Sequence, residues 1–64
     1  MKTYNITAQI YLKKDKYKQT ILMNELVEST NKTSAEDIFK LNLIINDAVL
    51  VKILSTEYIS QVAS

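Results

Sequence analysis

Apolar and polar residues alternate strictly near the start of the chain. One set of alternating positions is apolar and holds Ile6, Ala8, Ile10 and Leu12. The intervening set is polar and holds Thr7, Gln9, Tyr11 and Lys13. A period of two in a segment rich in Ile, Tyr and Thr is typical of a half-buried strand. The pattern therefore predicts a β-strand over residues 4–13 with one apolar and one polar face.

The next segment, residues 15–30, has a different pattern. Its apolar residues Leu22, Met23, Leu26 and Val27 recur at three- and four-residue spacing, which favours an amphipathic helix. A strand here would place the Glu25 carboxylate on the same face as the apolar residues. We therefore predict a helix with Asp15 as its N-cap, and keep a second strand over residues 17–28 as the alternative.

A second helix is predicted from about Ser34. Asn31 suits a left-handed turn after the first helix, and Thr33 with Glu36 forms the T-x-x-E capping box. The helix is apolar nearly all round, which requires burial nearly all round. Its apolar residues are Ile38, Phe39, Leu41, Leu43, Ile44, Ile45, Ala48 and Val49.

The C-terminal part of the chain has no Gly or Pro to mark a boundary. Residues 48–54 are β-branched enough to form a strand, but they could also continue the helix. Residues 55–64 are interpreted as a tail or a docking segment.

Composition limits the chemistry and favours association. At 64 residues the chain is one domain, residues 1–64, too small to bury a large core. It has no Cys and no His, so disulfides, metal centres and the usual catalytic bases and nucleophiles are not expected. We therefore expect no enzyme activity, no cofactor, no metal and a homodimer as the stabilising state. No signal peptide or membrane span is evident, which favours a cytoplasmic protein.

Charge is distributed unevenly along the chain. Residues 1–20 carry five lysines and one aspartate, whereas residues 21–64 carry three lysines and six acidic residues. The basic end is interpreted either as a binding patch for an anionic partner or as a solvated loop.

The predicted order of strand, helix, turn and helix resembles the ribbon-helix-helix family of DNA-binding repressors (Arc/MetJ type). The resemblance covers about residues 5–50 and rests on "TAQIYLK", "ILMNELVEST" and "NKTSAEDI". It implies a mostly α homodimer in which two N-terminal strands form one ribbon, with residues 51–64 as a C-terminal extension. The dimer core would hold Ile6, Ile10, Leu12, Leu22, Leu26, Ile38, Leu41 and Ile45.

The family resemblance also implies a function. Its members are small regulators of phage, plasmid or antitoxin type, whose ribbon reads the major groove of double-stranded DNA. The base-facing residues would be Thr7, Gln9, Tyr11 and Lys13. The phosphate-binding residues would be Lys14, Lys32, Thr33 and Ser34.

The alternative is an α+β chain of the order ββαβ, with strands at 17–28 and 48–54. This arrangement resembles small phage-encoded inhibitors of host enzymes and implies a protein-binding module. Tyr4-Asn-Ile-Thr7 and Phe39 resemble the uracil-DNA glycosylase inhibitors among them, but the acidic edge of those inhibitors is absent here, where residues 13–18 are basic. In the ribbon-helix-helix interpretation, residues 48–64 could bind a second protein, as antitoxins of that family do, or extend the dimer core. Their anchors would be Leu50, Ile53, Leu54, Tyr58 and Ile59.

Overall fold

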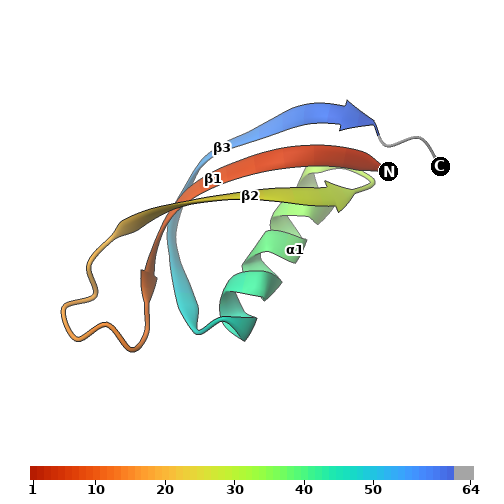
Figure 1. Ribbon diagram of the computed structural model, residues 1–64. Coiled ribbons are helices and arrows are strands. Elements are labelled where there is room, and N and C mark those ends of the chain that lie inside the picture. The colour runs from red at the N-terminus through yellow and green to blue at the C-terminus, as the bar shows by residue number, and fades with distance from the viewer. Residues whose placement is uncertain (62–64) are drawn as a thin grey trace.

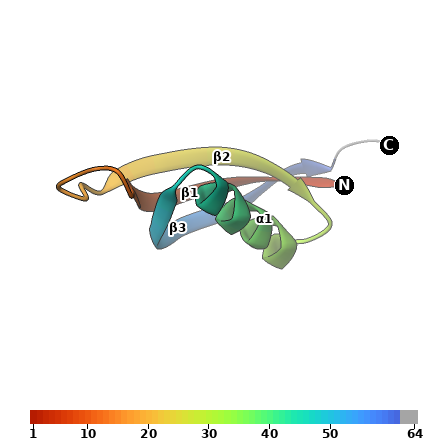
Figure 2. The ribbon, with the colours of Figure 1, turned by 90° about the horizontal axis from the view of Figure 1, so that it is seen from below.

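The fold is a three-stranded antiparallel sheet with one helix packed on one face (Figures 1 and 2). The structure is a computed structural model that describes residues 1–61. The elements are β1 (Lys2–Leu12), β2 (Ile21–Ser29), α1 (Lys32–Ile45) and β3 (Ala48–Gln61). The strand order is β2-β1-β3, so the first strand of the chain is the central strand of the sheet.

The prediction of a mostly α, ribbon-helix-helix fold is wrong, because β1 is paired along both edges within its own chain. Ile6, for example, pairs with Glu25 of β2 on one side and with Thr56 of β3 on the other. A strand whose two edges are both occupied cannot form a ribbon with a second subunit. The alternative order, ββαβ, is the one observed.

The predicted first helix over residues 15–30 is also wrong, since β2 occupies the second half of this segment. The helix-facing side of β2 carries Ile21, Met23, Glu25 and Val27, opposite helix-facing residues of β1. The argument against a strand was that it would bury the Glu25 carboxylate. The structure does half-bury Glu25, but Asn42 of α1 donates a hydrogen bond to its Oε1 at 3.2 Å. A polar partner offsets much of the cost of burying a polar group.

Asp15 organises the β1–β2 connection, residues 13–20, and does not cap a helix. Its carboxylate accepts hydrogen bonds from the backbone N–H groups of Tyr17 at 3.0 Å and Gln19 at 2.9 Å. Such contacts from an aspartate to the backbone just after it are typical of turns. Lys18 completes the reversal with a left-handed φ of 50°.

The helix α1 is confirmed, but its N-cap is Asn31 and not Thr33. The Asn31 side chain accepts a hydrogen bond from the Ser34 backbone N–H at 2.8 Å. Its φ of −155° is extended, so the predicted left-handed Asn31 is wrong. Thr33 lies inside the first turn, and the predicted capping box with Glu36 does not form.

Asn31→Ala should therefore lower the free energy of unfolding by about 1 kcal/mol, the usual cost of losing an N-cap side chain. Thermal melting followed by circular dichroism measures the loss. Lys32→Ala is the matched control, because Lys32 is exposed and its backbone already lies in the helix. Equal melting of the two variants would show that the Asn31 cap contributes nothing.

Residues 46–47 reverse the chain between α1 and β3 without a glycine. Asp47 takes a left-handed φ of 55°, and its carbonyl accepts a hydrogen bond from Lys13 N–H at 2.9 Å. Residues 48–54 are therefore strand, and β3 continues through the predicted tail as far as Gln61. The remaining residues of that tail, 62–64, lie outside the described residues.

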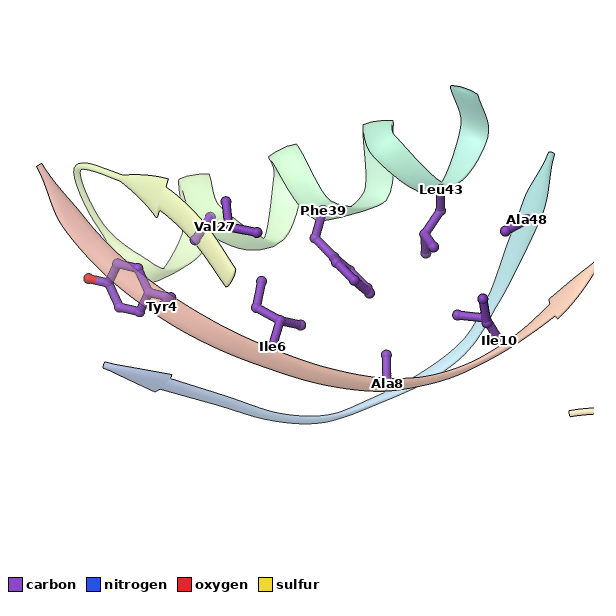
Figure 3. Packing of buried hydrophobic residues seen from close by; sticks show 9 residues of the cluster. Tyr4, Ile6, Ala8, Ile10, Val27, Phe39, Leu43 and Ala48 are labelled. Carbon is purple, nitrogen blue, oxygen red and sulfur yellow. The ribbon is translucent and has the colours of Figure 1, made fainter. Parts of the chain in front are cut away.

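The core lies between α1 and the helix-facing side of the sheet (Figure 3). The alternation predicted for β1 is confirmed, because its even-numbered residues from Tyr4 to Ile10 are buried. Phe39 of α1 is fully buried and points toward β1 between Ile6 and Ala8. The buried apolar residues are Tyr4, Ile6, Ala8, Ile10, Val27, Ala35, Phe39, Leu43 and Ala48.

The eight residues predicted to form a dimer core do not lie together. Ile6 and Ile10 are buried inside the single chain. The other six each keep more than a third of their surface exposed: Leu12, Leu22, Leu26, Ile38, Leu41 and Ile45.

Candidate protein-interaction surfaces

The sheet face opposite the helix is uncovered by any described element; we call it the open face. On β1 it carries the polar set of the alternating pattern, and Thr7 and Gln9 are half-buried there. Asn24 of β2 donates a hydrogen bond to Thr7 Oγ1 at 2.9 Å. Because residues directly opposite in antiparallel strands share a face, the register adds residues of β2 and β3. The added residues are Leu22, Asn24, Leu26 and Glu28 of β2 and Lys52, Ser55 and Glu57 of β3.

The predicted DNA-binding residues are divided among three places. Thr7, Gln9 and Tyr11 lie on the open face, while Lys13 and Lys14 follow β1 in the β1–β2 connection. The other predicted phosphate-binding residues begin α1, at the opposite end of the sheet (Figure 1): Lys32, Thr33 and Ser34.

The geometric basis for reading DNA with a ribbon is therefore missing. The open face also carries the carboxylates of Glu28 and Glu57, which repel phosphate. DNA binding stays a prediction.

Two side-chain hydrogen bonds hold α1 above the sheet, one on each flank. Asn42 Nδ2 donates to Glu25 Oε1 of β2 at 3.2 Å, and Thr56 Oγ1 of β3 donates to Glu36 Oε2 at 2.6 Å. Both bonds are partly buried, so they fix which side of the helix faces β2 and which faces β3. Glu25 Oε2 is buried with no partner among the described residues.

An aliphatic ridge runs along the solvent side of α1, toward β2; we call it the helix stripe. It consists of Ile38, Leu41 and Ile45, which are 37%, 59% and 76% exposed. Spacings of three and four residues place these side chains on one side of a helix. Asn42, which contacts β2, lies beside them on the helical wheel. Residues at this spacing form a ridge that packs into a groove.

A cavity of about 270 Å³ lies between the last turns of α1 and the first residues of β3. Its lining is mostly aliphatic, and the two lysines that line it are exposed. The lining residues are Lys13, Lys40, Leu43, Ile44, Ala48, Val49 and Leu50.

The outer edge of β3 is unpaired in the described part of the chain. Of the five anchors predicted in this segment, Leu50 and Ile53 pack against the core, and the other three are exposed. Tyr58, one of the exposed three, makes an edge-to-face contact with Tyr4 at 5.9 Å between ring centroids. The exposed apolar residues of β3 are Val51, Leu54, Tyr58 and Ile59, each 45–55% exposed.

Residues 1–61 show no cluster of three or more side chains suited to hold a metal ion. Within the same residues, no helix has the length and apolar character needed to cross a membrane.

Comparison with known proteins adds nothing to these surfaces: no family model, no curated protein and no solved structure matches the chain. The ribbon-helix-helix resemblance therefore gains no support from relatives. The surfaces must be interpreted from their own chemistry.

Proposed function

We propose that the protein is a small protein-binding module that inserts its helix stripe into an apolar groove on another protein. The supporting observation is that more of its large apolar side chains are exposed than buried. Fourteen large apolar side chains are exposed, whereas six large ones are buried among the described residues. Contiguous exposed apolar side chains commonly mark interaction sites.

The helix stripe fits this role better than the open face does. Ile38, Leu41 and Ile45 are aliphatic, adjacent and carried on a regular helix, which is how an amphipathic helix presents anchors to a groove. The open face intersperses Leu22 and Leu26 with amide, hydroxyl and charged groups. Polar groups therefore separate its exposed leucines, and the open face is better suited to form the polar rim of an interface than its apolar centre.

Site-specific photocross-linking in the cells that naturally produce the protein tests this proposal. Leu41→benzoylphenylalanine should yield a discrete heterologous cross-linked species, because position 41 lies in the middle of the helix stripe. Tyr17→benzoylphenylalanine is the control, since Tyr17 is 82% exposed but lies in the β1–β2 connection, away from the stripe.

The cross-linked protein is then purified and titrated with the full chain. Ile45→Lys should weaken that binding about tenfold or more, because placing a charge at a buried interface anchor costs about 1.4 kcal/mol or more. Circular dichroism confirms that the variant keeps the native fold. Equal cross-linking at positions 17 and 41, or unchanged affinity of the Ile45→Lys variant, would refute the proposal.

A further inference from the structure

The free edge of β3 is long, and most of its exposed side chains are apolar. The strand has fourteen residues and no proline or glycine, and its register against β1 shifts at three places, between Thr3 and Tyr4, Thr7 and Ala8, and Gln9 and Ile10. Val51, Leu54, Tyr58 and Ile59 are about half exposed along it. An edge of this kind presents unpaired backbone N–H and C=O groups to any strand that can match them.

We propose that a second copy of the chain covers this edge by pairing its β3 antiparallel to the first. The two sheets then form one sheet of six strands around a two-fold axis. In the register that pairs all of the described residues of β3, Ala48 lies opposite Gln61 and the axis falls between Leu54 and Ser55. This interface does not include the helix stripe, so it stands independently of the proposed function.

Charge complementarity selects that same register. Lys52 and Glu57 are equally far from the centre of β3, so each lies opposite the other residue in the second copy. Within one chain, Lys52 pairs with Gln9 and Glu57 pairs with Asn5, both on the open face. Regular alternation would put residues five apart on opposite faces, but β3 shifts register against β1 between Thr7 and Ala8, which leaves Leu54 as an extra residue. Because of this shift, Lys52 and Glu57 share a face, as directly opposed antiparallel residues must. The dimer contains this oppositely charged pair twice, and such cross-strand pairs stabilise a sheet.

The apolar residues of β3 are matched in the same register. Val51 lies opposite Tyr58 of the second copy in this register, which places an aliphatic residue against an aromatic one. Leu50 lies opposite Ile59 of the second copy. Because Leu50 pairs with Ile10, it faces the helix side and lines the 270 Å³ cavity.

The other free edge, that of β2, is not self-complementary. Its full-length antiparallel register places Glu25 opposite Glu25 of the second copy, because Glu25 is the middle residue of Ile21–Ser29. Like charges directly opposite each other destabilise a strand pair. The β3 edge is therefore the one that fits a second copy.

A charge exchange tests the dimer by analytical ultracentrifugation over a range of concentrations. Lys52→Glu and Glu57→Lys should each raise the dimer dissociation constant about tenfold or more, since each change turns two attractive pairs into repulsive ones. The double variant Lys52→Glu/Glu57→Lys should restore most of the affinity. Both residues are exposed in the single chain, so all three variants should keep the native circular dichroism spectrum.

Cysteine cross-linking locates the interface, because the natural chain has no cysteine. Ser55→Cys lies next to the proposed axis and should form an intersubunit disulfide under mild oxidation. Asn24→Cys is the matched control in the middle of the opposite edge strand.

A monomer at all concentrations would overturn the proposal. So would cross-linking through position 24 in place of position 55, or single charge variants that the double variant does not rescue. These outcomes leave the helix-stripe experiment unaffected, so the two proposals fail separately.

Discussion

Phe39→Ala should leave the isolated protein largely unfolded at room temperature. Phe39 has no exposed surface and is the largest fully buried side chain of the core. Replacing a buried phenylalanine by alanine costs about 3–5 kcal/mol through lost transfer free energy and the cavity left behind. A core in a domain this small rarely supplies more than about 3–5 kcal/mol in total, so the substitution removes most of the stability.

Urea denaturation followed by circular dichroism measures this effect. Ile45→Ala is the control on the same helix, because Ile45 is 76% exposed, and it should change the free energy of unfolding by no more than about 0.5 kcal/mol. A cooperative transition for Phe39→Ala within about 1 kcal/mol of the parent would show that the core does not depend on this ring.

Ala8→Leu should destabilise the fold for the opposite reason, because too much volume enters the core. Ala8 is completely buried on the central strand, and the Phe39 side chain points toward it (Figure 3). Forcing a larger side chain into a packed site costs about 1–3 kcal/mol. In a chain of this length, that loss should lower the melting temperature by about 4–8 °C per kcal/mol.

A leucine at the neighbouring position 9 is the control that separates this packing effect from the general effect of introducing a leucine. Gln9→Leu places the same side chain on the open face, where Gln9 pairs with Leu22 and Lys52. Its melting temperature should stay close to that of the parent, since Gln9 is only half-buried and lies outside the core. Identical melting temperatures for the two leucine variants would show that the core around Ala8 has room for a larger side chain.

The sequence predicted β1 and α1 but kept β2 only as an alternative to a helix, and Glu25 explains the difference. Alternation in β1 places no charge on the buried side, so the period of two is unambiguous. In β2 the same alternation requires a carboxylate among apolar residues. The Asn42 amide that stabilises this carboxylate is 17 residues away, and local patterns contain no information about such a partner.

The boundaries of α1 and β3 were misplaced because competing residues offer similar local signals. Asn31 and Thr33 are both acceptable N-caps, and the chain uses the first. After the helix, Asp47 adopts the left-handed conformation that glycine usually provides. The sequence therefore has no glycine to indicate the turn into β3.

The candidate surfaces could be predicted only in part. Excess apolar residues on α1 indicated that some would need a partner, and Leu41 and Ile45 are indeed exposed. The pairing of Lys52 with Glu57 of a second copy could not be predicted from the sequence, because it depends on the extent and register of β3. Within the described part of β3 the two charges lie symmetrically about the centre, and the register shifts against β1 put both on the open face.

The position of β1 in the sheet has a consequence for biosynthesis. Its neighbours are the second strand and the last described strand, so one whole edge stays vacant until β3 has left the ribosome. Until then the nascent polypeptide consists of a hairpin and a helix with an unprotected backbone, the kind of species that associates wrongly when crowded. Closing the sheet joins residues nearly sixty positions apart, such as Lys2 and Gln61, and distant pairings of this sort make folding slow. The interval between the release of α1 and the release of β3 is therefore the stage at which the unpaired edge of β1 is most exposed to wrong association.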